Sequence, residues 1–582
     1  MCGFIYSNFG EESIFKDISS SLVHRGPDSK KFYSNNNLNH NLSFYRLSII
    51  DPSEKGNQPF IDDELITVSN CEIYNFKDIK QDLIDKGVKF NSNSDAEVIH
   101  HGYKIYGNDI FKKIEGMFAI FIYDIKKNII IFCRDHVGIK PLYFYHRGDK
   151  LAVCSEFLTL YKLIDKNNFS NLSDKYLLNF IYTPFNSTNK TIQESIFKAE
   201  PGCFYIYDIN KKKILNTRYW NLSFNKKNDK LSLDDKLDYF DELFNNAIQK
   251  HLISDVRIGS MLSGGVDSSL IAALSSKYTN NLNTYTIDIE NSLSKDDLRS
   301  IESLKQLGIT NTYISINYKE IMDNIDKSIK IFDDLSSSDG GFISNYFLLN
   351  KIKEFDPNLK VMLMGDGADE VFFGYNWFKI LKVKQIPKFL KKRIHYYAYN
   401  RVVNFKSFLK NSDYSNNLDL KHDNFYDQMR SYEISKQLPN HYLPKVDRST
   451  MYNSIEGRVP FLDKNVIEFA CSLQNEDLIK DNITKYFLRK YSEKYLPLDI
   501  SYKEKKGFGL SSKILMSQDI DKVRDIIMSE KSFSNKFFSK KYKNKLLSNN
   551  LKNQNNMFAL NQEVILWRIF LADLWYSNLS ND

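Results

Sequence analysis

The chain has 582 residues, too many for one hydrophobic core, so about two to four domains are expected. Apolar residues make up 42% of it and aromatic residues 14%, which is ample for packed globular domains. The net charge of +8, from 80 interspersed basic and 72 acidic residues, is typical of ordinary solubility rather than of a nucleic-acid-binding surface.

Cysteine usage and hydropathy indicate the compartment. The six cysteines form no C-x-x-C pair and no metal-ligand spacing, which argues against a zinc site and a disulfide scaffold and fits a reducing environment. The N-terminus lacks a basic segment followed by an apolar run, so no signal peptide is expected. No apolar stretch approaches the length of a membrane span. A soluble cytoplasmic protein is therefore predicted.

The N-terminus carries a candidate nucleophile. Removal of Met1 would leave Cys2 with a free α-amine, whose pKa of roughly 7.7–8.0 lets it accept the thiol proton at neutral pH. One residue would then supply both nucleophile and base. The alternative is that Cys2 is simply the second residue of the chain.

Local patterns in the first third predict a layered sandwich of sheets and helices. Apolar and alternating runs predict strands, and apolar residues at helical spacing predict helices. The strands are expected at 65–68, 118–123, 129–132 and 151–153, and the helices at 77–86 and 95–106.

The pattern changes after residue 220. A polar run without apolar periodicity predicts a linker at 221–232, and a helix is expected over 233–250. Strands predicted at 283–289, 313–316 and 360–364 alternate with helices, which indicates an open parallel sheet with ligands at the carboxyl ends of its strands. The segment 563–578, with two tryptophans, predicts a core-packing helix.

A glycine loop at 262–269 (Leu-Ser-Gly-Gly-Val-Asp-Ser-Ser) lies between a predicted strand and a predicted helix. Free backbone N–H groups and the helix dipole make such a junction an anion site. It is not a Walker loop, because Gly265 stands where that motif needs lysine. Asp267 would repel a bare phosphate, which suggests a metal ion between the two. Alone, the loop fits a plain structural turn equally well.

Two ordered sets of motifs extend over nearly the whole chain. The first set is 24–28, 46–51, 70–75, 94–97, 116–119 and 134–143, and the second is 262–269, 365–372, 443–451, 456–463 and 485–490. The first set resembles the glutaminase domain of class II glutamine amidotransferases, the N-terminal-nucleophile type, and within it the glutamine-hydrolysing asparagine synthetase family. The second set, which includes the glycine loop, resembles the synthetase core of that family, an ATP pyrophosphatase.

The resemblance implies a fold for each part. Residues 1–220 are expected to form an α+β N-terminal-nucleophile glutaminase sandwich. Residues 233–582 are expected to form an α/β ATP-pyrophosphatase domain with a parallel sheet and a helical C-terminal part.

The resemblance also implies roles in the glutaminase half. Cys2 would attack the glutamine side-chain amide, and Asn70 would donate to the oxyanion. The backbone N–H at Cys71 would be the second oxyanion donor; the family has glycine there, so a positive φ at Cys71 would cause strain. Arg46 would bind the α-carboxylate as a planar two-toothed donor, while Asp95 and Glu72 would face the α-ammonium. The implied glutamine-binding residues are Arg46, Ile49, Ile50, Asn70, Glu72 and Asp95.

In the synthetase half the resemblance implies sites for ATP and Mg²⁺. Asp267 and Asp369 would share the metal with the ATP phosphates. Asp366 and Glu370 would lie near the acceptor, Asp366 as a catalytic residue, and Lys505 would stabilise charge near the α-phosphate. The implied ATP-binding residues are Leu262, Ser263, Gly264, Gly265, Asp267, Ser268, Ile287, Met364 and Gly365.

The chain departs from the family pattern near the expected acceptor. Met364 stands where serine is usual, Phe373 where glycine is usual and Arg257 where proline is common, and 295–297 only partly matches a tyrosine–acid motif. The identity of the acceptor is therefore left open.

The expected reaction is glutamine- and ATP-dependent conversion of aspartate to asparagine through an acyl-adenylate, releasing AMP, pyrophosphate and glutamate. One alternative keeps the chemistry and changes the acceptor, for example to a sugar acid in surface-polysaccharide synthesis. Another is a non-catalytic homologue, against which Cys2, Asp267 and Asp369 argue.

The remaining expectations concern partners. The basic, aromatic segment 376–408 fits solvated helix faces, with an anionic membrane surface, an acidic partner or nucleic acid as weaker alternatives. No nucleic acid and no membrane span are expected. A homodimer is the default assembly.

Overall fold

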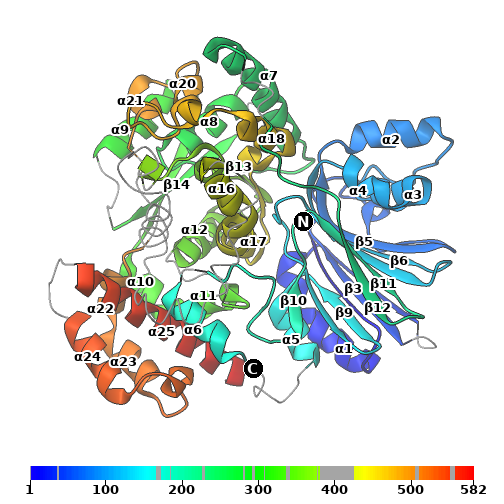
Figure 1. Ribbon diagram of the computed structural model, residues 1–582, viewed down its shortest axis with the longest axis horizontal. Helices are drawn as coiled ribbons and strands as arrows, with labels where there is room; N and C mark the ends of the chain where they lie inside the picture. Colours follow the sequence, from blue (N-terminus) through cyan, green and yellow to red (C-terminus); the bar gives the residue numbers. More distant parts are fainter. Residues whose placement is uncertain are drawn as a thin grey trace.

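The computed structural model describes residues 2–35, 39–164, 172–183, 185–225, 230–279, 282–290, 295–306, 308–335, 341–376, 378–379, 425–504, 510–550 and 557–581. Lys505 and most of the basic segment 376–408 lie outside these residues. An amino-terminal part built on antiparallel sheets stands beside a carboxy-terminal part built on a parallel sheet and helices (Figure 1).

The described amino-terminal residues form two six-stranded antiparallel sheets. The first has the order β10-β8-β9-β1-β3-β2, with β1 Cys2–Ser7, β2 Ser29–Asn35, β3 His40–Arg46, β8 Tyr143–Arg147, β9 Lys150–Cys154 and β10 Ile196–Lys198. The second has the order β12-β11-β7-β6-β5-β4, with β4 Phe60–Ile61, β5 Leu65–Ile73, β6 Gly116–Asp124, β7 Ile129–Arg134, β11 Cys203–Asp208 and β12 Lys213–Arg218.

The two sheets pack face to face because side chains alternate along each strand. Phe4 and Tyr6 of β1 meet Phe121 of β6, with ring centroids 6.3 and 4.6 Å apart. Helices cover the outer faces: α1 (Glu12–Ser19) and α5 (Phe157–Ile164) on one side, α2 (Phe76–Asp85), α3 (Glu97–Tyr106) and α4 (Ile110–Lys113) on the other (Figure 1). The sandwich and its predicted strands and helices are confirmed.

The carboxy-terminal part contains a parallel sheet of order β15-β14-β13-β16-β17. Its strands are β13 Ile258–Met261, β14 Asn283–Ile289, β15 Asn311–Ile316, β16 Val361–Leu363 and β17 Glu456–Arg458. Associated helices include α7 Leu233–His251, α8 Val266–Ser275, α9 Lys295–Lys305, α12 Gly341–Phe355 and α13 Ala368–Phe372. β13 and β16 are neighbours, so the glycine loops that follow them meet at one edge of the sheet.

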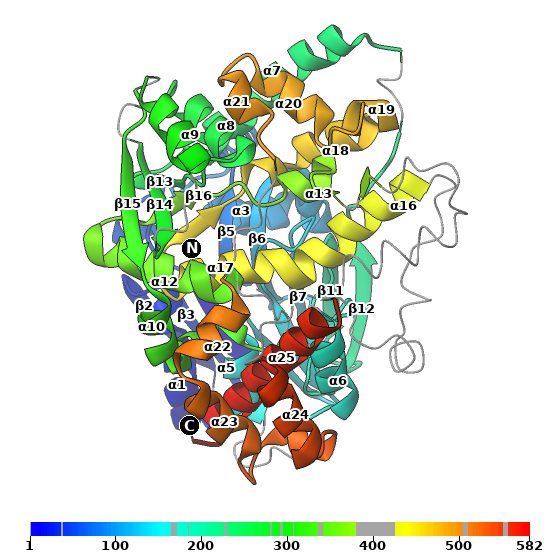
Figure 2. The ribbon, with the colours of Figure 1, turned by 90° about the vertical axis from the view of Figure 1, so that its left-hand side faces the viewer.

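A long helical run lies between this sheet and the amino-terminal part (Figure 2). It consists of α16 (Phe425–Tyr432), η8 (Glu433–Tyr442) and α17 (Leu443–Met451). The middle segment is π-helical and contains Pro439. π-Helical turns are rare and frequently occur at functional sites. After it come α18 Lys464–Ser472, α19 Asn475–Leu478, α20 Tyr486–Ser492 and α21 Leu498–Ser501.

The chain ends in the predicted helical part, with α22 Ser512–Gln518, α23 Ile520–Met528, α24 Lys540–Asn550 and α25 Met557–Asn581. α25 packs against α6 (Asp174–Tyr182) (Figure 2). Trp567 and Trp575 are buried, and the Trp575 indole N–H donates to the Asp333 carbonyl at 3.0 Å, which confirms the core-packing helix. Among the described residues, no helix combines the length and apolar character needed to cross a membrane.

Candidate active sites

The predicted nucleophile lies at the edge of the first sheet. Cys2 opens β1 and pairs with Arg46 of β3, so strand register alone places the thiol beside the residue expected to bind glutamine. The Cys2 N–H donates to Asn70 Oδ1 at 3.0 Å, which joins β1 to β5 of the facing sheet. Burial raises the pKa of the Cys2 thiol, so a nearby base must take its proton.

Asn70 is oriented to act as a hydrogen-bond donor. Its Oδ1 accepts from Cys2, while its buried Nδ2 has no hydrogen-bond partner among the described residues. An unsatisfied buried amide is costly unless a ligand completes it. The structure therefore offers a free donor directly beside the nucleophile, as an oxyanion site requires.

Cys71 lies inside β5 and is not among the residues with positive φ. The N–H groups of Ser69 and Ile73 donate to the side chains of Gln58 and Asp95, away from β6. Strand alternation points the Cys71 N–H to that same edge. A non-glycine residue is thus accommodated without backbone strain.

The predicted glutamine-recognition residues surround this edge. Arg46 donates to the carbonyls of Ile50, Asp51 and Ser53 at 3.2, 2.5 and 2.8 Å, so it holds the loop that follows β3. Ile49 and Ile50 are buried in that loop. Asp95 accepts from the Ile73 N–H at 2.8 Å, and burial raises the pKa of its carboxyl to about 6.

Glu72 connects this site to the other half of the molecule. Its Oε2 lies 2.9 Å from an Arg458 guanidinium nitrogen on β17, while its Oε1 has no hydrogen-bond partner within the described part of the chain. Arg458 also pairs with Glu456 and donates to the carbonyls of His251 and Ile253 at 2.7 Å. One Glu72 oxygen is therefore engaged across the interface, and its role toward glutamine stays a prediction. The motif 456–463 is recognisable in the sequence, but nothing in its residues predicts this contact.

The nucleotide loop has the predicted strand–turn–helix form. Gly264 has φ +70° and Gly265 is the N-cap of α8. The Ser263 N–H donates to Ser268 Oγ at 3.1 Å, and the two hydroxyls are 3.0 Å apart. A Cβ on Gly365 would lie 3.3 Å from the Ser268 nitrogen, so glycine there lets the two loops approach closely.

The other predicted nucleotide residues lie close by in the fold. Buried Leu262 donates its N–H to the Tyr285 carbonyl at 2.8 Å, and buried Ile287 follows on β14. Lys505 cannot be placed, because it lies outside the described residues.

The two predicted metal ligands are joined by a lysine. Lys485 Nζ lies 2.7 and 2.6 Å from the Asp267 carboxylate oxygens and 2.6 Å from Asp369 Oδ1. A Cβ on Gly374 would lie 1.8 Å from Asp369 Oδ1 and 2.2 Å from Lys485 Cε, so glycine is needed there. Lys485 belongs to the family motif 485–490, but the sequence alone predicts no role for it.

These carboxylates are suitable ligands for Mg²⁺, which is usually held by one or two carboxylates together with substrate phosphates. No larger cluster of potential metal ligands occurs among the described residues. The donor set therefore fits a metal that binds together with a phosphorylated substrate. Without that metal, Lys485 balances the charge of the two carboxylates.

Near the predicted acceptor residues, Asp366 pairs with Lys445 Nζ at 3.1 Å and Glu370 accepts from the Tyr375 hydroxyl at 2.5 Å. Burial and the Asp369 carboxylate raise the pKa of Glu370 to about 7. Phe373 has φ +57° and stacks on Phe378 at 4.2 Å. Phe373, in place of the expected glycine, therefore carries backbone strain, and its ring packs against an aromatic neighbour.

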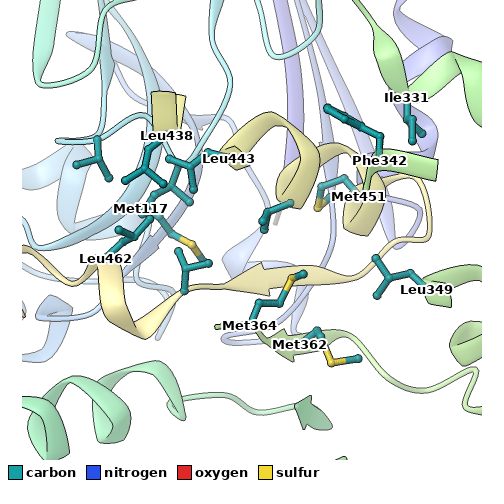
Figure 3. Packing of buried hydrophobic residues seen from close by; sticks show 14 of the residues in the cluster. Met117, Ile331, Phe342, Leu349, Met362, Met364, Leu438, Leu443, Met451 and Leu462 are labelled. Carbon is teal, nitrogen blue, oxygen red and sulfur yellow. The ribbon is translucent and has the colours of Figure 1, made fainter. Parts of the chain in front are cut away.

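An apolar seam joins the two halves. Met117 of β6 lies with Leu438, Leu443 and Leu462 of the carboxy-terminal part, and Met364 continues the cluster toward the nucleotide loops (Figure 3). A small cavity in the seam is lined by Ile139 and Leu142 on one side and by Leu443 and Pro444 on the other. Arg25 reinforces the seam through Asp447 at 2.9 Å.

The fold and these sites define a two-part amidotransferase, with a candidate thiol nucleophile on a β-sandwich and a candidate anion-binding loop on a parallel sheet. The glutamine amidotransferase domain family model matches residues 1–220, and the asparagine synthase family model matches residues 239–577. The chain belongs to the asparagine synthase family.

Curated relatives agree with this assignment. The chain is 29% identical to asparagine synthetase [glutamine-hydrolyzing] 1 of Bacillus subtilis over 91% of this chain and 90% of that one. It is 28% identical to asparagine synthetase [glutamine-hydrolyzing] 3 of the same organism, over 86% and 84% of the two chains. A putative asparagine synthetase [glutamine-hydrolyzing] 2 of Methanocaldococcus jannaschii is 30% identical over 67% of this chain and 79% of that one. The protein is a carbon–nitrogen ligase with glutamine as amido donor.

Proposed function

We propose that the protein amidates aspartate to asparagine through an acyl-adenylate, with AMP, pyrophosphate and glutamate as the other products. The observation that carries the proposal is the pairing of two sites across one apolar seam. On one side Cys2 lies beside Asn70 Nδ2, which has no hydrogen-bond partner among the described residues, and on the other Asp267 and Asp369 converge at the glycine loop.

In the glutaminase half, Cys2 Sγ attacks the side-chain amide carbon of glutamine after the α-amine has taken the thiol proton. Asn70 Nδ2 and the Cys71 N–H donate to the developing oxyanion. The carbon–nitrogen bond then breaks and ammonia leaves with a proton. Water hydrolyses the remaining thioester to glutamate and restores the thiol.

In the synthetase half, ATP places its phosphates at the N-terminus of α8, where backbone N–H groups and the helix dipole favour anions. Asp267 and Asp369 would hold Mg²⁺, which when bound neutralises charge on the phosphates. The acceptor carboxylate attacks the α-phosphorus and pyrophosphate leaves. Ammonia then attacks the acyl carbon and AMP leaves, while Asp366 accepts a proton from the attacking nitrogen. Lys505 is proposed to stabilise the α-phosphate.

The proposed route of ammonia between the two halves follows the apolar seam. Met117, Leu438, Leu443 and Leu462 line it with groups that neither protonate ammonia nor hold it by strong hydrogen bonds. Neutral ammonia would therefore stay nucleophilic on the way to the adenylate.

The test is AMP formation by the purified protein with MgATP and glutamine, with and without aspartate. AMP and asparagine that appear only with aspartate would support the proposal. Glutamate release without aspartate-dependent AMP would contradict aspartate as the acceptor. That result would favour the second candidate, another carboxylate acceptor. Met364 and Phe373, which replace the usual serine and glycine near the predicted acceptor site, support this candidate.

A further inference from the structure

Residues 252–257, which join α7 to β13, contact both halves and have no part in the expected mechanism. We call this segment the connector. It leads directly into the strand that carries the nucleotide loop. Near its start, the carbonyl of Ile253 accepts from Arg458 at 2.7 Å, and Arg458 also pairs with Glu72 of the glutaminase half. The connector is therefore linked to a residue of the predicted glutamine site.

A second link between the connector and the glutaminase half is formed by Asp255. The Asp51 N–H donates to Asp255 Oδ2 at 2.8 Å, and the Asp255 N–H donates to the Ile49 carbonyl at 3.1 Å. Both partners lie in the loop after β3, residues 47–53, which we call the glutamine loop. Because hydrogen bonds are directional, two bonds that run in opposite senses fix the orientation of the glutamine loop as well as its distance from the connector.

Asp51 has a backbone conformation that its contacts must stabilise. Its φ is +50°, in the left-handed region, which is unfavourable for a non-glycine residue. Such residues persist when surrounding contacts determine their conformation, and they often lie at functional sites. The Asp51 carboxylate accepts from the N–H groups of Ser53 and Asn93 at 3.2 and 2.7 Å, within the glutaminase half. The acceptor for the Asp51 N–H, Asp255, comes from the synthetase half.

The glutamine loop in turn determines where Arg46 lies. The Arg46 guanidinium donates to three backbone carbonyls of this loop. A Cβ on Gly56 would lie 2.3 Å from Arg46 Nη2, so the guanidinium is also confined on that side. Since Arg46 is the residue predicted to bind the α-carboxylate of glutamine, a displaced loop would move the group that recognises the substrate.

We propose that Asp255 is a positioning residue for glutamine. The synthetase half contributes this carboxylate to hold the glutamine loop, and through the loop Arg46, in the form that binds the α-carboxylate. The inference rests on the proposed glutamine site and adds to it a residue from the other half of the chain. Asp255 acts through Asp51 and Arg46, so its removal should weaken glutamine binding and spare the chemistry at Cys2.

Asp255→Ala tests the proposal, because it removes the acceptor of the Asp51 N–H and keeps the backbone bond to Ile49. Asp255 is exposed, so water can satisfy the Asp51 N–H and the variant should keep its Tm. Water does not fix the loop, and the KM for glutamine should therefore rise about fivefold, less than the roughly tenfold or more expected for a buried bond to a charged group. The kcat for glutamate release should change less than about twofold, because only substrate binding is affected.

Two further variants and a second assay separate positioning from a general structural role. Asp255→Asn keeps an oxygen acceptor for the Asp51 N–H and should restore the KM for glutamine to within about twofold of the native value. Asp238→Ala removes an exposed carboxylate of α7 in the same half and should leave this KM unchanged. AMP formation with ammonium chloride, which needs no glutamine site, should be unaffected in all three variants. A structural role would instead lower Tm and reduce AMP formation with both nitrogen sources.

Glutamate release needs no acceptor, so the test is independent of the acceptor's identity. Calorimetric binding of glutamine to Cys2→Ala, with and without Asp255→Ala, adds a measurement that needs no turnover. Binding that is about fivefold weaker in the double variant would support the inference even where aspartate gives no AMP, a result that contradicts the proposed reaction alone. An unchanged Kd and KM for glutamine in Asp255→Ala, or the same rise in Asp255→Asn, would overturn the inference. No glutamine binding at all would overturn both.

Discussion

The two active sites differ in how their polar groups are satisfied before substrate arrives. In the glutaminase site, Asn70 Nδ2 and Glu72 Oε1 have no hydrogen-bond partner among the described residues. In the nucleotide site, Lys485 already holds Asp267 and Asp369, and Lys445 holds Asp366.

This difference has a chemical reason. An oxyanion site works when its donors are fixed and free, because they then need no reorganisation during the reaction. A site for a highly charged substrate contains carboxylates, which cannot stay buried without a counter-charge. The first site is therefore preorganised, whereas the carboxylates of the second site are paired with lysines of the protein itself.

The largest expected effect is confined to the first site. Cys2→Ala should lower glutamine-dependent AMP formation by about 10³-fold or more, because the nucleophile is lost. Ammonium-dependent formation should stay within about twofold. The two nitrogen sources are compared in one assay, with Cys154→Ala as the buried-cysteine control. An equal loss with both sources would mean that the sites are not separable.

Arg458→Met should damage both sites at once. It leaves Glu72 and Glu456 buried without their cation, which costs about 3–5 kcal/mol of stability. Burial alone would raise the pKa of Glu456, but Arg458 holds it at about 2. Urea denaturation and both half-reactions are measured, with Arg458→Lys as partial rescue. A loss in only one half-reaction would contradict the shared role.

Phe373→Gly compares the free energy of backbone strain with that of ring packing near the second site. Removing a left-handed non-glycine residue should gain about 1 kcal/mol, while losing a fully buried ring should cost about 3–5 kcal/mol. Packing should win, so the midpoint of urea denaturation falls. A stabilised variant would show that the aromatic ring is retained for the acceptor and not for the fold.

Asp95 should give the first site a pH dependence. Burial raises the pKa of this carboxyl to about 6, so glutaminase kcat/KM should fall about tenfold per pH unit below 6, as the group proposed to face the substrate ammonium is neutralised. The stability contribution has the opposite sense: it is present below the unfolded value near 3.9 and lost as pH rises through about 6. The acid limb should disappear in Asp95→Asn; its persistence there would assign it to another group.

The smallest expected effect is that of Cys71→Gly, which should change glutaminase activity by less than about twofold. Cys71 is extended, so glycine relieves no strain. A large gain in a glutaminase assay would mean that the native oxyanion donor is misplaced.

Much of the molecule follows from local pattern. Alternating apolar runs predict β5, β6 and β7, and helical spacing predicts α2 and α7, because burial of one face fixes both period and register. The loop from Ser263 to Ser268 connects a strand directly to a helix. Its conformation therefore depends on neighbouring residues and can be predicted from them. Cys2 and Asn70 were matched to a known family as motifs, and the structure brings them within hydrogen-bond distance.

The tertiary structure decided what depends on distant residues. Arg458 reaches Glu72 across 386 positions of sequence, and Lys485 reaches Asp267 across 218. No local periodicity encodes such contacts, because a buried ion pair is specified by the packing of elements that are far apart in the chain. The π-helical form of η8 is likewise a product of its surroundings, since Pro439 inside the helix runs against ordinary helix propensity.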